Sequence, residues 1–179
     1  MPQKRQDPLP GDLTATLKAV SRTIYFSFKV LPPDIRLPMA LAYLLCRAMD
    51  TIVDSSVADP GEKKKFLDLV TGIGPGFDPA AGAAAAAAFL AGVKHKGERA
   101  LLGSMGDVFE RVLSLEEADL ADLGKVAAGV ASGMRMDLAL FEGGSARAPR
   151  ALPDDDALLR YCDFIGGKPG VFWTALYMR

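Results

Sequence analysis

Four polar residues with chemical potential lie close together in one segment of the chain. Tyr43, Arg47, Asp50 and Asp54 are spaced four, three and four residues apart, so an α-helix would place them in one stripe on one face. Two carboxylates four residues apart, about 6 Å from each other on a helix, can share hard cations such as Mg²⁺. An arginine beside them suits a phosphate group. The stripe therefore indicates a magnesium and phosphate site.

The surroundings of this stripe indicate burial. Over residues 38–53, every residue outside the stripe except Thr51 is apolar, and a helix that is apolar all round lies inside a bundle. A buried charge is costly unless it is paired. Arg47 can neutralise one aspartate, which leaves the other in need of a cation. A structural alternative stays open, in which Arg47 bridges to Asp50 or Asp54 and the stripe has no function.

The elements that must position the stripe are predicted to be helices, because alanine and leucine dominate and strand patterns are nearly absent. Asp12 can cap a first helix, and Pro32 and Pro33 end it, since proline lacks an amide proton and restricts the residue before it. The expected fold is all-α, an antiparallel helical bundle. The predicted helices cover about residues 12–28, 34–55, 63–70, 83–93, 98–113, 116–141 and 154 onwards.

Composition and charge narrow the class of protein. The chain has 179 residues, and its 21 basic and 22 acidic residues give a net charge of −1. This balance argues against a nucleic-acid partner bound through bulk charge. The one histidine, His95, argues against a histidine-based zinc site or catalytic triad. Two cysteines, Cys46 and Cys162, form no disulfide framework, so a reduced, cytoplasmic setting is expected.

The ends of the chain and its apolar runs bear on domains and membranes. Residues 1–11 are polar and proline-rich and are expected to form a flexible lead, followed by one helical domain over 12–179. The longest apolar run outside the stripe segment, residues 80–93, is too short to span a bilayer, which takes about 20 residues. Contact with a membrane, for instance the inner membrane, would therefore be peripheral.

Three stretches of the chain resemble one protein family. SRTIYFSFKVLPPDIRLPMALAYLLCRAMDTIVD, residues 21–54, resembles the first signature of the squalene and phytoene synthase family in the order and spacing of its parts. YCDFIGGKPG, residues 161–170, is similar to the family's tyrosine–cysteine segment. GMRMDL, residues 133–138, resembles the glycine–methionine helix between them. The resemblance extends from about Val20 to the end of the chain.

The resemblance implies an all-α fold of the isoprenoid synthase type and a role for each matching residue. Asp50 and Asp54 would hold Mg²⁺ ions that grip a diphosphate. Tyr43 and Tyr161 would line the reaction centre, with their hydroxyls near the cation or the leaving group, and Arg47 would act beside them. The residues that bind diphosphate oxygens would be Ser21, Arg22, Thr23 and Arg47.

The family's enzymes join two prenyl diphosphates head to head. Loss of one diphosphate leaves an allylic cation, and the double bond of the second prenyl group attacks it to give a cyclopropyl intermediate. LLCRAMDTIVD and VFW, residues 171–173, look more like bacterial squalene-synthase-like proteins. Farnesyl diphosphate is therefore the favoured substrate and squalene the favoured product, with a phytoene or dehydrosqualene type of synthase as the alternative. NADPH would reduce the intermediate if the product is squalene.

The chain departs from the family pattern in two places. The family carries a second aspartate-rich metal motif after the tyrosine segment, and this chain reaches Arg179 without one. We therefore expect an N-terminal portion of a family member, with an incomplete bundle and little or no synthase activity alone. Its exposed apolar surface would favour self-association or a missing C-terminal half. Lys168 and Pro169 replace apolar residues, so we expect a kink there, with the lysine facing the diphosphate or solvent.

Two other classes of function stay open. The chain fits a non-catalytic helical family member that serves as an assembly factor, or a purely structural bundle. The intact Arg47, Asp50 and Asp54 favour a working site, whereas the missing second motif favours the assembly factor.

Overall fold

The computed structural model describes residues 11–55, 58–141, 144 and 147–179, so residues 1–10 of the predicted lead lie outside the described residues. Within this part of the chain every regular element is a helix, which confirms the all-α prediction. The helices are α1 (Gly11–Ser21), η1 (Arg22–Ile24), α2 (Tyr25–Val30), α3 (Pro33–Val53), α4 (Pro60–Val70), α5 (Pro79–Ala87), η2 (Leu90–Gly92), α6 (Lys96–Gly103), α7 (Met105–Leu113), α8 (Glu117–Leu140), α9 (Asp155–Cys162), η3 (Asp163–Gly167) and α10 (Lys168–Tyr177).

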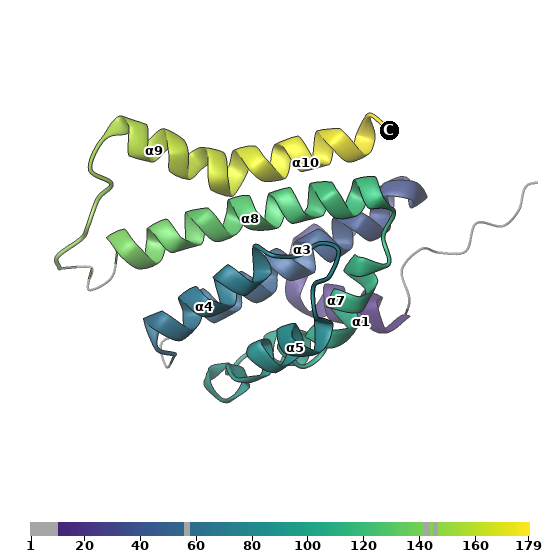
Figure 1. The fold of residues 1–179 in the computed structure, drawn as a ribbon, viewed down its shortest axis with the longest axis horizontal. Helices are drawn as coiled ribbons and strands as arrows, with labels where there is room; N and C mark the ends of the chain where they lie inside the picture. The colour runs from purple at the N-terminus through teal and green to yellow at the C-terminus, as the bar shows by residue number, and fades with distance from the viewer. Residues whose placement is uncertain (1–10, 56–57, 142–143, 145–146) are drawn as a thin grey trace, which may run out of the picture.

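The two long helices, α3 and α8, organise the bundle. α3 packs against α8 and also contacts α6 and α7. After α8 the chain turns back, and α9 and α10 run antiparallel along its other side as an outer layer (Figure 1). α3 and α10 both pack against α8 and also contact each other. A site can therefore form where these three helices meet.

The α3 sequence explains its central place. Leu41, Leu44, Leu45, Met49 and Ile52 are fully buried, as the apolar segment around the stripe predicted. Burying each such side chain contributes about 1.5–3 kcal/mol relative to leaving it exposed. The polar stripe is thus carried on a helix whose apolar side chains are firmly packed in the core.

Aspartates define where several helices begin. The Asp59 carboxylate accepts hydrogen bonds from the amides of Gly61 and Glu62, at 2.8 and 3.3 Å. The Asp154 carboxylate accepts from the amide of Ala157 at 2.7 Å, which confirms the predicted start of the last helix. Such caps satisfy amides that have no partner inside the helix, and each stabilises the helix by about 0.5–2 kcal/mol.

The prediction of one first helix over residues 12–28 is wrong. Arg22 has φ +48, in the left-handed region, so the regular helix ends at Ser21. The 3₁₀ turn η1 and the short helix α2 then follow in a new direction. A non-glycine residue with positive φ costs about 1–2 kcal/mol, and burial of Phe28 against the core offsets that cost.

The prediction of one helix over residues 98–113 is also wrong. The chain forms α6 and α7 instead, with a break at Ser104. The Ser104 hydroxyl donates to the Leu101 carbonyl at 3.0 Å, which satisfies a carbonyl at the end of α6. Two short helices can therefore pack in different directions, and α6 approaches α1 while α7 contacts α5.

The segment around Pro169 bends through a π-helical turn. η3 covers the residues just before Lys168 and joins α9 to α10, which accommodates the proline predicted to kink the helix. The Lys168 ammonium pairs with the Asp163 carboxylate at 2.9 Å. Its stem lies over Gly129 of α8, where an added Cβ would come within 2.6 Å of the Lys168 Cγ. Lys168 therefore faces the Asp163 carboxylate and the surface of α8 at Gly129.

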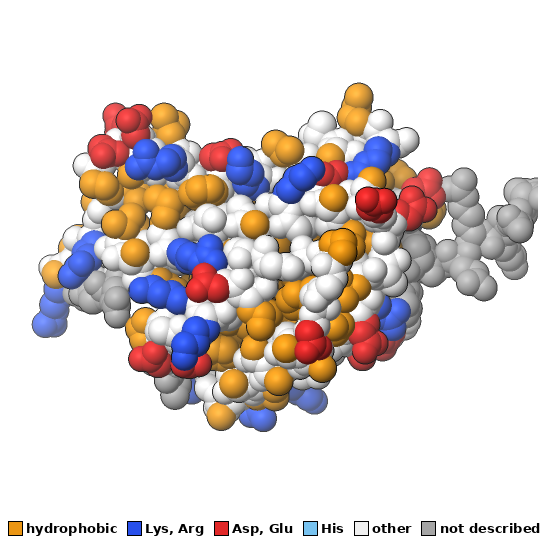
Figure 2. Space-filling model, in the orientation of Figure 1, with side chains coloured by type: hydrophobic (Ala, Val, Ile, Leu, Met, Phe, Trp, Pro, Cys, Tyr) orange, Lys and Arg blue, Asp and Glu red, His pale blue; other side chains and the backbone are white. Residues whose placement is uncertain are grey.

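The outer layer exposes apolar side chains. Leu159, Val171, Tyr177 and Met178 are each about two-thirds or more exposed, which agrees with the expected exposure of apolar surface. In Figure 2, apolar side chains reach the surface along the upper edge of the molecule, which α9 and α10 form. Among the described residues, no helix is both long and apolar enough to cross a membrane.

Candidate functional site

A cavity of about 500 Å³ lies between α3, α8 and the η3–α10 segment, with η1 and α2 contributing to its wall. A volume of this size is typical of small-molecule sites. Most of the wall is apolar, including Phe28, Met39, Val130, Met134 and Trp173. The polar residues of the wall are Ser27, Tyr43, Cys46, Arg47, Asp50, Asp54, Asp137 and Tyr161.

The cavity brings together the predicted residues of two distant sequence segments. The stripe residues Tyr43, Arg47, Asp50 and Asp54 all line it from α3. Tyr161 lines it from α9, the helix that follows α8 in the sequence. The predicted stripe of α3 and the tyrosine predicted from YCDFIGGKPG therefore face one space.

Arg47 is held between two carboxylates. Its Nη1 lies 2.6 Å from the Asp50 Oδ2, and its Nη2 lies 2.5 Å from the Glu98 Oε1 of α6. The bridge from Arg47 to Asp50 is the one that the structural alternative anticipated. Glu98 was not predicted, because it lies 51 residues further along the chain, in a charged stretch with no motif.

The two stripe carboxylates differ in their surroundings. Burial raises the pKa of Asp50, the negative charge of Asp54 raises it further, and Arg47 opposes both effects. Asp54 is exposed, just beyond the end of α3. A raised pKa means that this site disfavours a second negative charge unless more positive charge is supplied.

A hydrogen bond across the cavity joins Tyr161 to Asp137. The Tyr161 hydroxyl donates to the Asp137 Oδ2 at 3.3 Å. Burial is the main cause that raises the pKa of Asp137, and the charge of Asp54 adds to it. Burial likewise raises the pKa of Tyr161, and so does the nearby Asp137. Asp137 was missed as a site residue although it belongs to GMRMDL, a segment already singled out.

Tyr43 sits deeper in the same wall. Its hydroxyl donates to the Val20 carbonyl at 3.3 Å, and its ring packs edge-on against Phe28 at 5.5 Å. Burial raises the pKa of Tyr43. Tyr43 is therefore a neutral hydroxyl that ties α3 to the end of α1.

Comparison with known proteins gives the family. The family model described as squalene/phytoene synthase matches residues 17–179. The chain belongs to the squalene/phytoene synthase family.

One solved structure extends the comparison to the fold. A complex of TcSQS, a squalene synthase, with a ligand superposes with a TM-score of 0.65 at 21% sequence identity. The alignment covers 93% of this chain and 44% of that chain, so the chain spans less than half the length of this neighbour. The fold is thus of the isoprenoid synthase type. No curated protein sequence matches the chain.

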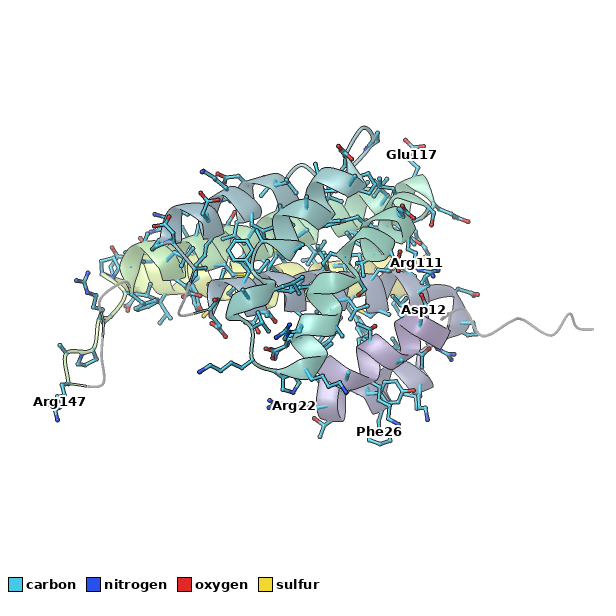
Figure 3. All side chains as sticks on the ribbon, turned by 90° about the horizontal axis from the view of Figure 1, so that it is seen from below. Asp12, Arg22, Phe26, Arg111, Glu117 and Arg147 are labelled. Carbon is cyan, nitrogen blue, oxygen red and sulfur yellow. The ribbon has the colours of Figure 1, made fainter. Side chains whose placement is uncertain are left out.

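The remaining residues suggested by the family resemblance, Ser21, Arg22 and Thr23, do not line the cavity. Ser21 is buried, and its hydroxyl donates to the Leu17 carbonyl of its own helix at 2.6 Å. Arg22 and Thr23 are exposed, and Figure 3 shows Arg22 at the outer edge of the N-terminal helices. The positive charge of Arg22 nevertheless acts to lower the pKa of Tyr43. The diphosphate-binding role of these three residues stays a prediction.

The carboxylates of the wall fit the divalent cation that the family implies. Within the described residues, no group of three or more His, Cys, Asp or Glu side chains is placed to hold a metal ion. Magnesium in phosphate sites, however, takes one or two carboxylates and completes its shell with water and phosphate oxygens. Asp50 and Asp54 line the cavity together and repel one another, as the raised pKa of Asp50 reflects. A bound cation would relieve that repulsion.

Proposed function

We propose that this chain forms the prenyl-binding cavity and one diphosphate-binding wall of an enzyme that condenses two prenyl diphosphates head to head. The observation that carries the proposal is the combination of an apolar cavity with a charged wall on α3. The apolar side suits a prenyl chain, and the wall of Arg47, Asp50 and Asp54 suits its diphosphate. Membership of the squalene/phytoene synthase family supports prenyl transfer at the level of the family.

Each part of the cavity has a task in this reaction. Arg47, fixed by Asp50 and Glu98, would place positive charge where the diphosphate departs, so that charge developing in the transition state meets a prearranged partner. Mg²⁺, when bound by Asp50 and Asp54, would supply Lewis-acid stabilisation of the leaving diphosphate. The apolar wall would exclude water from the allylic cation until the second prenyl double bond attacks it.

The two tyrosines would act as oriented hydrogen-bond donors and would stay un-ionised. Tyr161 is aimed by its hydrogen bond to Asp137, and Tyr43 by its bond to the Val20 carbonyl. Their raised pKa values keep both hydroxyls protonated near neutral pH, so both can donate hydrogen bonds to a diphosphate or interact with the cation through their rings.

Farnesyl diphosphate as substrate is the specific form of this proposal, with a phytoene or dehydrosqualene type of synthase as the alternative. Squalene as the final product would require NADPH to reduce the cyclopropyl intermediate, and the proposal covers the condensation alone. A second candidate is a non-catalytic helical family member, supported by the pairing of Arg47 with Asp50 and Glu98, which already engages its guanidinium group.

A substrate series tests the proposal. Farnesyl and geranylgeranyl thiodiphosphates are titrated against the chain by calorimetry with and without Mg²⁺, and extracts from parallel incubations with the natural diphosphates are analysed by mass spectrometry. We expect both thiodiphosphates to require Mg²⁺ for binding, and the farnesyl compound to bind more tightly than the geranylgeranyl compound. Farnesol, which lacks the diphosphate, should bind more weakly than either. A condensed product indicates the enzyme, and binding without product indicates the second candidate. Equal affinity for farnesol and the thiodiphosphate would contradict both.

A further inference from the structure

The short helix α2 exposes apolar side chains beside the cavity. Phe26 is 68% exposed and Val30 is 82% exposed, and their spacing of four residues places them on one face of α2. Ile24, in the turn η1 that precedes α2, is 49% exposed and also lines the cavity. Figure 3 shows Phe26 at the outer edge of the N-terminal helices. These three side chains, together with the exposed Lys29, are called the α2 face below.

The α2 face is held in place from its inner side. Phe28 and Leu31 are buried and belong to the hydrophobic core. The Arg36 guanidinium of α3 donates to the Leu31 carbonyl at 2.8 Å and to the Lys29 carbonyl at 3.4 Å, at the end of α2. Because the inner residues fix the helix, the fold itself turns the apolar residues of the α2 face toward solvent. Exposed apolar groups that are fixed in this way mark an interaction site.

Positive charge surrounds the α2 face. Residues 13–33 contain three basic residues and no acidic one, and these three, Lys18, Arg22 and Lys29, are all exposed. The adjoining helix α6 packs beside α1 and begins at Lys96, which is also exposed. Apolar side chains on a basic surface match a bilayer that contains anionic lipids, because the apolar groups enter the acyl boundary while the basic groups stay with the lipid phosphates.

The outer layer of α9 and α10 also exposes apolar side chains, but its charges differ. Residues 154–179 contain four acidic and three basic residues. Two of the three basic residues are already paired, Lys168 with Asp163 and Arg179 with Asp119. An anionic lipid surface would also be repelled by the run of aspartates at the start of α9. Charge complementarity therefore favours the α2 face over the outer layer.

We propose that the α2 face docks on a membrane surface that carries anionic lipids, with Phe26 and Val30 in the lipid boundary and Lys29 at the phosphate level. Docking needs no prenyl compound, so it does not depend on the proposed function. Because Ile24 belongs both to the α2 face and to the cavity wall, docking would place the cavity next to the lipid, from which an apolar chain would enter it.

Co-sedimentation with vesicles tests the proposal. Vesicles of phosphatidylglycerol and phosphatidylcholine in equal parts are compared with vesicles of phosphatidylcholine alone, at low and at high salt. We expect at least about tenfold tighter binding to the anionic vesicles, since each basic side chain near such a surface contributes about fivefold. The preference should fall at high salt, because salt screens the charges of protein and lipid from each other. Equal binding to both kinds of vesicle, or no binding to either, would overturn the proposal.

Phe26→Ser removes the largest apolar group of the α2 face. It should weaken binding to the anionic vesicles by about tenfold, because the free energy of burying the ring in lipid is lost. The matched control is Leu159→Ser in the outer layer, where the side chain is 67% exposed, and it should bind within about twofold of the unmodified chain. Both variants change exposed side chains, so their unfolding midpoints should stay within about 2 °C. Unchanged binding in Phe26→Ser, or an equal loss in Leu159→Ser, would contradict the proposal.

Lys29→Gln provides an independent variant that tests the charge. It should weaken binding to the anionic vesicles by about fivefold and leave binding to phosphatidylcholine unchanged, whereas Lys64→Gln, an exposed change on α4, should alter neither by more than about twofold. Losses of equal size in the two variants would show a general charge effect and would refute docking through this face.

Sedimentation velocity separates the membrane from a second copy of the chain as the occupant. If Phe26→Ser dissociates an oligomer and leaves vesicle binding unchanged, the α2 face is an interface between copies and the proposal is wrong. Failure of the proposed function would instead appear as absence of Mg²⁺-dependent binding of prenyl thiodiphosphates, with vesicle binding intact.

Discussion

The replacement Glu98→Gln tests the clamp that holds Arg47. Glu98 lies 2.5 Å from the Arg47 Nη2 and links the charged wall to α6. The Glu98 side chain is 20% exposed and that of Arg47 is 26% exposed, so solvent screens the pair only partly. Glutamine preserves the size of the side chain and one hydrogen-bond acceptor but removes the negative charge.

The expected change in the free energy of unfolding follows from this partial burial. A hydrogen bond to a charged group contributes about 1.5–3 kcal/mol, and the exposure of the pair and the retained acceptor reduce that figure. We therefore expect the free energy of unfolding at pH 7 to fall by about 1–2 kcal/mol, which corresponds to a midpoint about 3–6 °C lower. The affinity for farnesyl thiodiphosphate should rise, because the wall loses one negative charge and Arg47 has one competitor fewer.

The same replacement has a consequence for the pH dependence of stability. Glu98 is one of the charges that raise the pKa of Asp50 above its ordinary value of 3.8. Because the folded state holds this proton more tightly than the unfolded state, Asp50 makes the free energy of unfolding fall as pH rises from below 3.8 through the raised value. In Glu98→Gln that fall should be smaller.

Chemical denaturation between pH 3 and pH 7 measures both effects, and calorimetry measures the affinity. Glu110→Gln is the matched control, since Glu110 is exposed on α7, and it should change none of these quantities. If Glu98→Gln leaves stability at pH 7 unchanged and also leaves the affinity unchanged, the clamp does not hold Arg47 in solution and the reasoning fails.

Two further predictions concern packing and thiol reactivity. Gly133→Ala should lower the free energy of unfolding by about 1–3 kcal/mol in denaturant titrations, because its Cβ would come within 2.9 Å of the Ile165 Cγ1 and 3.1 Å of the Phe164 Cβ, atoms close to the backbone of η3. A stability equal to that of the unmodified chain would count against the close approach of η3 to α8. Cys46, half-buried in the cavity wall, should react with iodoacetamide at pH 8 more slowly than the exposed Cys162, because burial and then the charge of Asp50 raise the pKa of Cys46 to about 12. Equal rates of labelling in peptide mass spectra would refute this.

Much of the fold and part of the site follow from local patterns in the sequence. The spacing of Tyr43, Arg47, Asp50 and Asp54 was sufficient to place four side chains on one helix face, and the structure turns that face toward a cavity. The start of the last helix could also be predicted from a local signal, because the Asp154 side chain caps the amide of Ala157 three residues later. Periodicity and capping act over one or two turns. The stripe on α3 and the start of α9 depend on them and were predicted correctly, whereas the helices predicted over residues 12–28 and 98–113 are each interrupted.

The missed features depend on contacts between distant residues. Glu98 reaches Arg47 only because α6 packs beside α3, and no pattern near residue 98 indicates that contact. Asp137 becomes a site residue only through the hairpin that brings Tyr161 back along α8. The positive φ of Arg22 has no compositional signal either, since arginine is an ordinary helix former.

The most direct measurement of the central claim is the Mg²⁺ dependence of farnesyl thiodiphosphate binding in Asp50→Asn, compared with the unmodified chain and with Asp107→Asn, an exposed change on α7. If Asp50 holds the cation that grips the diphosphate, the unmodified chain and Asp107→Asn bind tightly only with Mg²⁺, and Asp50→Asn loses at least about tenfold in affinity together with the response to Mg²⁺. Binding by Asp50→Asn with the same affinity and the same response to Mg²⁺ would contradict the proposed site.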